Sequence, residues 1–127
     1  MKPKKIKILL IEDDNFLSGI YVAKFEMEGF EIIAERRGEE GQKIAKKEKP
    51  DVILLDILLP GKDGFAVLKE LKTDAATSRI PVIVMTNLSE DSNVKKAFDL
   101  GATDYLVKAH FLPAEIIDKV KKVISKK

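Results

Sequence analysis

Cysteine is absent from this chain of 127 residues, and histidine occurs only once, as His110. Without cysteine the protein can form no disulfide, no thiolate metal site and no thiol nucleophile. A single histidine also cannot build a zinc cluster or a catalytic triad with cysteine. Any chemistry in this chain must therefore use oxygen ligands and lysine.

Long apolar runs and a large excess of one charge are also missing. The longest apolar stretches, such as 8–11 and 52–55, are far shorter than the roughly 18 residues that a membrane-spanning helix needs. The basic start is followed by too few apolar residues for a signal peptide. Lys and Arg total 23 against 21 Asp and Glu, so the net charge of +2 gives no reason to expect nucleic acid as a partner. We predict a cytoplasmic protein that binds neither membranes nor nucleic acid directly.

The sequence does contain a regular alternation of apolar runs and helical patterns. Short runs rich in Ile, Val and Leu predict five strands, at 6–11, 30–35, 51–55, 81–86 and 104–107. The first, third and fourth runs are apolar on successive residues, which predicts central strands that are covered on both faces. The second and fifth runs are more mixed, as expected for edge strands.

Apolar residues at helical spacing lie between and after these runs. They predict five one-sided helices, marked by Leu17, Ile20 and Met27; by Gly41, Ile44 and Ala45; by Gly64, Val67, Leu68 and Leu71; by Val94, Ala97 and Phe98; and by Ile116, Ile117, Val120, Val123 and Ile124. Gly29 and Gly101 suit helix ends, and Pro113 suits a first turn. Five strands alternating with five helices predict an α/β fold, a (βα)5 doubly wound parallel sheet in the order 2-1-3-4-5. We expect one domain over residues 1–127.

Acidic residues gather where the first and third predicted strands end. Glu12 and Asp13 follow the first strand, Asp56 ends the third, and the predicted strand order places these ends side by side. Two carboxylates about 5 Å apart repel by roughly 3 kcal/mol at an effective dielectric constant near 20, so we expect at least three converging carboxylates to hold a cation. A set of oxygen ligands without His or Cys favours Mg²⁺.

Asp56 differs from the other acidic residues near strand ends. It interrupts the apolar run 52–59, where neither a turn nor a helix cap requires a charge, and burying an unpaired carboxylate is costly. We interpret Asp14, Asn15 and Asp63 as helix caps or turn formers instead.

Two more strand ends point to the same crevice. Thr86 ends the fourth predicted strand and brings a hydroxyl, and Lys108 follows the fifth and brings an ammonium. A carboxylate nucleophile, a hydroxyl donor, a cation and a metal that neutralises oxygens compose a site for phosphoryl transfer.

Four motifs occur in a fixed order along the chain. They are ILLIEDD at 8–14, PDVILLD at 50–56 with LPGKDG at 59–64, PVIVMT at 81–86, and GATDYLVK at 101–108. In this order and spacing the sequence resembles the receiver domain of two-component response regulators, the CheY-like family with a flavodoxin-like fold. The resemblance covers essentially the whole chain.

This resemblance implies a role for each candidate residue. Asp56 would accept a phosphoryl group from the phosphohistidine of a sensor histidine kinase or phosphotransfer protein. Asp13, Asp56 and the backbone carbonyl of Leu58 would ligate Mg²⁺, and Glu12 would assist directly or through water. Thr86 and Lys108 would bind the phosphoryl oxygens.

The resemblance further implies a signalling switch. The Thr86 hydroxyl would move towards the phosphoryl group, Tyr105 would turn inward, and the face made by the fourth helix, fifth strand and fifth helix would change for a downstream protein. Candidate contacts on that face are Lys95, Lys96, Asp99, Lys119 and Lys122. We expect a phosphoacceptor regulator rather than an enzyme, without an output domain, that is a monomer or a phosphorylation-dependent dimer.

Two positions depart from the family pattern. The family normally has proline after the lysine, joined by a cis bond that aims the ammonium into the site, whereas this chain has Ala109. We predict that the bond between Lys108 and Ala109 is nevertheless cis. Asn87 stands where the family has a small residue, and its amide would either obstruct the path to phosphorus or hydrogen-bond a phosphoryl oxygen. We predict slower dephosphorylation as a result.

Other functions fit the residues less well than a receiver. A phosphatase of the haloacid dehalogenase type needs a second Asp two residues after its nucleophile, and that position is Leu58. The glycines at 61 and 64 match neither the phosphate-binding loop nor the dinucleotide-binding pattern. A pseudo-receiver that is not phosphorylated and serves as a docking module remains as the alternative function.

Overall fold

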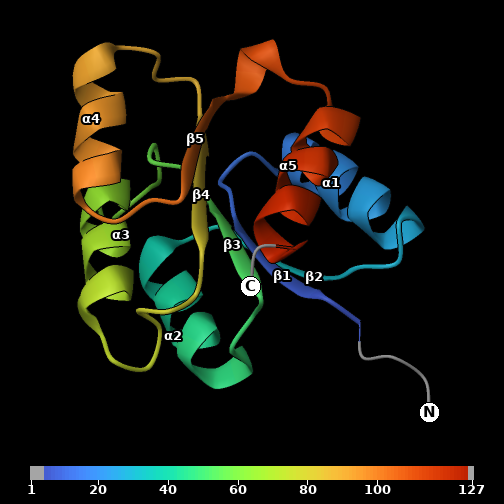
Figure 1. The fold of residues 1–127 in the computed structure, drawn as a ribbon, viewed down its shortest axis with the longest axis horizontal. Helices are drawn as coiled ribbons and strands as arrows, with labels where there is room; N and C mark the ends of the chain where they lie inside the picture. Colours follow the sequence, from blue (N-terminus) through green and yellow to red (C-terminus); the bar gives the residue numbers. More distant parts are fainter. Residues whose placement is uncertain (1–4, 126–127) are drawn as a thin grey trace.

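The computed structural model describes residues 5–125, so residues 1–4 and 126–127 of the predicted domain lie outside the described residues. Strands and helices alternate along the chain (Figure 1). The elements are β1 (Lys7–Ile11), α1 (Asn15–Met27), β2 (Glu31–Glu35), α2 (Gly38–Glu48), β3 (Val52–Leu55), α3 (Gly64–Thr73), β4 (Val82–Thr86), α4 (Asp91–Asp99), β5 (Asp104–Val107), the 3₁₀ turn η1 (Lys108–His110) and α5 (Pro113–Ser125). The predicted strands are confirmed to within one residue at each end.

The five strands form one parallel sheet in the order β2-β1-β3-β4-β5, which confirms the predicted α/β fold. Residues 8–11 and 52–55 are fully buried, and so are all five residues of β4. The edge strands β2 and β5 contain partly or fully exposed residues. The burial therefore follows the pattern that continuous and mixed apolar runs predict.

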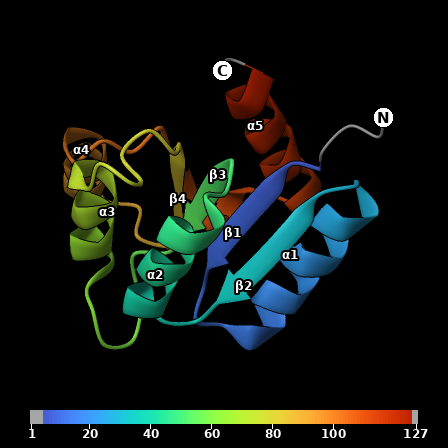
Figure 2. The ribbon, with the colours of Figure 1, turned by 90° about the horizontal axis from the view of Figure 1, so that it is seen from below.

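Helices cover both faces of the sheet. α1 and α5 lie on one face, and α2, α3 and α4 lie on the other (Figures 1 and 2). Each face has its own apolar core, one built around Phe25, Ile116 and Val120 and the other around Leu68 and Leu71. Because the strand order reverses between β1 and β3, the carboxyl ends of these two strands are left uncovered by helices.

The buried face of α1 differs from the predicted one. Met27 is 77% exposed, whereas Ser18, Tyr21 and Phe25 face the core. The two aromatic residues four positions apart bury more area than Met27 would, and Phe25 packs edge-on against the ring of Phe30, with centroids 5.3 Å apart. The helix exists as predicted, but aromatic burial sets its orientation.

The predicted caps Asp14 and Asp63 are confirmed and help to fix the loops around the strand ends, whereas Asn15 is the first residue of α1. The Asp14 carboxylate accepts hydrogen bonds from the N–H groups of Phe16 and Leu17 at the start of α1, and Asp63 accepts one from Phe65 at the start of α3. Gly29 and Gly101 follow α1 and α4 with positive φ angles of 90° and 105°, which glycine adopts without a steric penalty. Within residues 5–125 no helix is long and apolar enough to cross a membrane.

Candidate functional site

The sheet register brings the predicted site residues to one edge. β1 and β3 pair Ile11 with Leu55, so the acidic residues that follow each strand are neighbours. β4 and β5 pair Thr86 with Val107, which places Lys108 beside the end of β4. Both β4 and β5 end toward the top of Figure 1, where loops lead to α4 and α5.

Lys108 lies at the centre of this edge. Its Nζ atom is 2.6 Å from Asp56 Oδ2 and also forms an ion pair with Glu12 Oε1. The side chains of all three residues are buried, with 8% of Lys108, 7% of Asp56 and 2% of Glu12 exposed. We name these three residues the charge cluster. Two carboxylates share one ammonium, so the charge cluster carries a formal charge of −1.

Burial and pairing act in opposite directions on the charge cluster. Burial raises the pKa of Glu12 despite the hydrogen bond from Lys108, since removal from water disfavours the carboxylate. Burial by itself would lower the pKa of Lys108, but its hydrogen bonds to Asp56 and Glu12 outweigh this, and the pKa is raised above its ordinary value. Lys108 is therefore a fully charged ammonium at neutral pH.

Asp13 lies at the exposed rim rather than in the charge cluster. Its Oδ1 atom accepts a hydrogen bond from Arg36 Nη2 at 3.1 Å, and both side chains are about half exposed. Within residues 5–125 no three side chains of His, Cys, Asp or Glu come together as a group that could hold a metal ion. The structure thus brings two of the predicted carboxylates onto Lys108 and directs the third to Arg36.

Main-chain groups of β1 and of the loop after β3 hold Asp56 from both sides. The Asp56 N–H donates to Ile11 O at 3.0 Å, and the Leu58 N–H donates to Asp56 Oδ1 at 3.0 Å. Asp56 Oδ1 is thus fixed by its own loop, while Oδ2 faces Lys108. This arrangement leaves a buried carboxylate of fixed orientation at the end of a strand.

Thr86 and Tyr105 lie on the β4 and β5 side of the site. Thr86 is fully buried, and its Oγ1 atom lies 3.5 Å from the N–H of Leu88. The Tyr105 hydroxyl donates a hydrogen bond of 2.7 Å to the carbonyl of Leu88. The predicted hydroxyl and the predicted switch aromatic are therefore both connected to the loop between β4 and α4.

The prediction of a cis bond between Lys108 and Ala109 is wrong. The peptide bonds of residues 5–125 include none in the cis form. A cis bond to a non-proline residue costs about 2.5 to 4 kcal/mol, and the chain avoids this by forming the turn η1 directly after β5. Lys108 reaches the site from a trans peptide.

Two contacts at this edge could not be predicted from sequence patterns. Arg36 follows β2 and binds Asp13 across the edge of the sheet, although no motif marks it. The Ala109 N–H donates to Asn87 Oδ1 at 3.1 Å, a contact between the two positions that depart from the family pattern. In the sequence, only the fact that Asn87 and Ala109 both depart from the family pattern pointed to the second contact.

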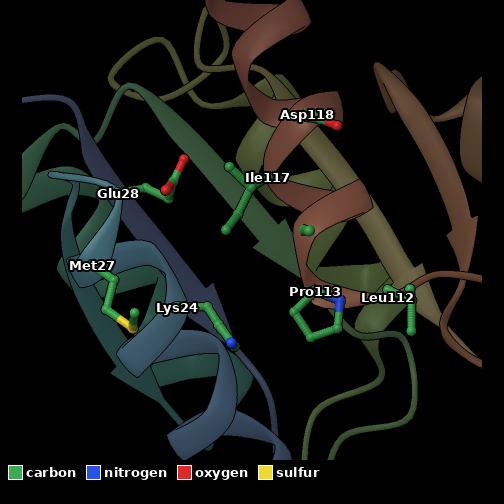
Figure 3. Close-up of a pocket in the computed structure, with 8 residues that line it drawn as sticks. Lys24, Met27, Glu28, Leu112, Pro113, Ile117 and Asp118 are labelled. Carbon is green, nitrogen blue, oxygen red and sulfur yellow. The ribbon is translucent and has the colours of Figure 1, made fainter.

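A separate groove lies between α1 and α5 (Figure 3). Its walls come from the end of α1 and the start of α5, at Lys24, Met27, Glu28, Leu112, Pro113, Ala114, Ile117 and Asp118. This groove does not include the charge cluster.

Comparison with known proteins decides the family. The model of the response regulator receiver domain matches residues 8–121. The chain belongs to this family. The fold, the strand order and the acidic strand ends of this receiver domain agree with that membership.

Two relatives illustrate how far the similarity extends. The DNA-binding dual master transcriptional regulator RpaA of Synechocystis sp. is 36% identical over 118 residues, which are 93% of this receiver domain and 48% of RpaA. Protein PilH of Pseudomonas aeruginosa is 36% identical over 102 residues, which are 80% of this chain and 84% of PilH. The chain spans about half the length of RpaA and of several other transcriptional regulators that it matches.

Solved structures share the fold. The receiver domain of the sensor histidine kinase PA1611 from Pseudomonas aeruginosa superimposes with a TM-score of 0.87 at 25% sequence identity, over 96% of this chain and 99% of that chain. That structure has a magnesium ion coordinated in its active-site cleft.

Proposed function

We propose that this receiver domain is a phosphorylation-dependent switch of a two-component system, with Asp56 as the phosphoacceptor. One observation carries the proposal: a buried Asp56 carboxylate is held by the Leu58 N–H on one oxygen and by the Lys108 ammonium on the other. Any buried carboxylate needs a counter-charge, but a lysine on the oxygen that its own loop leaves open also supplies the cation that a phosphoryl acceptor needs for the oxygens it receives.

In the proposed reaction the phosphoryl group moves from a donor histidine to Asp56. An Asp56 oxygen attacks the phosphorus of a phosphohistidine, a new O–P bond forms, and the N–P bond breaks with its electron pair left on the imidazole. Lys108 and the Thr86 hydroxyl neutralise and hydrogen-bond the transferred oxygens. Reversal of the switch is hydrolysis, in which water attacks phosphorus and restores the Asp56 carboxylate with release of inorganic phosphate.

We propose Mg²⁺ as the cofactor, on the basis of the donor set. The charge cluster is formally negative, Asp13 directly follows its member Glu12 in the chain, and carboxylate oxygens suit a hard cation. Asp13, Asp56 and the Leu58 carbonyl would hold the ion, with Glu12 assisting; this set has two carboxylates and needs no third acidic side chain. The bound ion would neutralise negative charge on the phosphoryl group. The magnesium in the PA1611 receiver domain supports this assignment.

The proposed output runs through the loop between β4 and α4. Thr86 and Tyr105 both contact Leu88 in that loop, so movement of the Thr86 hydroxyl towards a phosphoryl group would disturb the hydrogen bond of Tyr105. The face of α4, β5 and α5 would then change for a downstream protein, and the proposed phosphodonor is a histidine kinase or phosphotransfer protein. The domain itself acts as a regulator rather than an enzyme on other substrates, in the cytoplasm.

The direct test is phosphorylation by a small acyl-phosphate donor in the presence of Mg²⁺, followed by intact mass spectrometry. We expect one added phosphoryl group on the wild-type protein and none after Asp56→Asn or without divalent metal. Asp63→Asn is the matched control, since Asp63 is a carboxylate near the same edge that caps α3, and asparagine also caps helices well. Phosphorylation of Asp56→Asn would show that another residue accepts the phosphoryl group, and no phosphorylation of the wild type would favour the docking module.

A further inference from the structure

The two positions at which this chain departs from the receiver pattern contact each other. Asn87 directly follows β4, Ala109 follows Lys108, and the strand register brings the two strand ends together. The Ala109 N–H donates a hydrogen bond of 3.1 Å to Asn87 Oδ1. The two departures are therefore parts of one structural feature.

This hydrogen bond requires both departures. A proline at position 109 has no N–H to donate. Alanine or glycine at position 87 would have no side-chain oxygen to accept. Each residue thus provides the group that its partner needs.

The bond lies where the main chain needs an acceptor from outside. η1 begins at Lys108 and is closed by the Phe111 N–H, which donates to Lys108 O at 3.2 Å. N–H groups in the first turn of a helix have no partner within the helix. Asn87, at the neighbouring strand end, accepts the hydrogen bond of the Ala109 N–H. This contact fixes the direction in which the chain leaves β5.

The orientation of Lys108 depends on that direction. Lys108 is the first residue of η1 and the neighbour of Ala109, and its ammonium reaches Asp56 at 2.6 Å. A pocket opens beside this turn, with Asn87, Ala109 and Phe111 among its lining. Asn87 and Ala109 are both exposed there, so their hydrogen bond lies at the surface of the turn rather than in the core.

We infer that Asn87 is a positioning residue for Lys108. Its side-chain carbonyl holds the Ala109 N–H and keeps the ammonium of the trans-linked Lys108 aimed at Asp56. In the family pattern, a cis proline after the lysine aims the ammonium into the site, and here Asn87 does so instead. The consequence for phosphorylation rests on the proposed function, but the positioning itself does not.

The test compares Asn87→Leu with Asn87→Asp. Both side chains have the size of asparagine, and only aspartate keeps an oxygen acceptor. Two rates are measured without metal or phosphodonor: hydrogen exchange of the Ala109 amide by NMR, and modification of Lys108 by an amine-acylating reagent, quantified by peptide mass spectrometry. Loss of one hydrogen bond predicts that both rates rise about threefold or more in Asn87→Leu. In Asn87→Asp we expect the exchange rate and the acylation rate to stay within about twofold of the wild-type values.

Ala109→Pro provides the second arm. It removes the N–H donor, so adding Asn87→Leu should leave the acylation rate of Lys108 unchanged from that of Ala109→Pro alone. Equal acceleration by Asn87→Leu in both backgrounds would overturn the inference, as would similar effects of leucine and aspartate at position 87. Circular dichroism checks folding, and if Ala109→Pro does not fold, the comparison of leucine with aspartate decides.

Binding of beryllofluoride with Mg²⁺ separates this inference from the proposed function. We expect wild type to bind and Asn87→Leu to bind about threefold or more weakly, since the ammonium is less often in place. If the acylation results hold but wild type does not bind, the phosphoacceptor function fails and the positioning role stands. If wild type binds and Asn87→Leu leaves acylation unchanged, the positioning role alone fails.

Discussion

At the scale of single residues, the charge cluster has one positive and two negative members, so opposite changes in it should have opposite effects on stability. Replacing Lys108 by methionine leaves Glu12 and Asp56 buried without a counter-charge. Breaking a buried pair in this way costs about 3 to 5 kcal/mol. We expect Lys108→Met to lower the free energy of unfolding at pH 7 by about 3 kcal/mol, measured by urea denaturation.

The pH dependence of this loss has a definite sign. Burial raises the pKa of Glu12 in the folded protein above its ordinary value, and loss of the ammonium would raise it further. The folded state then binds protons more readily than the unfolded state, so stability rises as pH falls through that range. The loss of stability in Lys108→Met should therefore be smaller at pH 5 than at pH 7.

Asp56→Asn should have the opposite effect on stability. It makes the charge cluster neutral and should raise the free energy of unfolding by about 1 kcal/mol. Destabilisation by both changes would contradict the assigned charges.

A second residue-scale prediction concerns the rim. Arg36 occupies Asp13 Oδ1, and its positive charge opposes a cation at the proposed metal site. We expect Arg36→Ala to strengthen Mg²⁺ binding by about twofold to fivefold, the range for an exposed ion pair, as measured by calorimetric titration. Arg37→Ala is the matched control, because it removes the same charge one residue away from a side chain that pairs with Glu39 instead. Equal effects of the two changes would indicate general electrostatics rather than competition for Asp13.

At the scale of elements, α3 packs so closely on the Asp56 loop that its first residue must lack a side chain. A Cβ atom on Gly64 would lie 2.4 Å from both Cα and O of Ile57, which are main-chain atoms that cannot rotate away. Ile57 directly follows Asp56, so movement there would also displace the proposed phosphoacceptor. The closeness of helix and loop is thus part of how the site is held.

Gly64→Ala should therefore destabilise the protein by about 1 to 3 kcal/mol, the usual cost of overpacking. It should also slow phosphorylation of Asp56. Gly19→Ala is the matched control: Gly19 lies inside α1, and a Cβ atom added there would meet no neighbouring group within 4 Å, so alanine should stabilise by about 0.5 to 1 kcal/mol. Urea denaturation measures the loss of stability in Gly64→Ala and the gain in Gly19→Ala. If Gly19→Ala also destabilised the protein, the lack of space around Gly64 would not explain the effect of Gly64→Ala.

At the scale of the whole molecule, the fold was predictable because each strand is a short apolar run bounded by turns. Continuous runs gave the three central strands and mixed runs gave the edges, and the strand order followed from the βαβ rule. The cluster of Asp56, Glu12 and Lys108 followed in turn, because parallel strands end at a common edge. These features depend on the apolar runs and on the residues that end each run, which can be read along the chain without knowing any contact between distant segments.

Other features depend on contacts between distant segments and could not be predicted in the same way. The hydrogen bond from the Ala109 N–H to Asn87, beside the trans bond after Lys108, joins residues that are 22 positions apart in the chain. The pairing of Asp13 with Arg36 and the burial of Phe25 rather than Met27 also depend on packing across the sheet. The predicted roles of Asp56, Thr86, Tyr105 and the metal ligands remain predictions for the experiments above.

The last prediction concerns the whole fold, because the site is assembled from the ends of four strands. A ligand that bridges Asp56, Thr86 and Lys108 binds the folded chain alone, so it must stabilise the molecule globally by mass action. At beryllofluoride and Mg²⁺ concentrations a hundredfold above the dissociation constant, the gain is about 2.7 kcal/mol. For a domain of this size that corresponds to a rise of roughly 10 °C in Tm, measurable by calorimetry. Asp56→Asn should show no such rise, and an equal rise in that variant would place the ligand elsewhere.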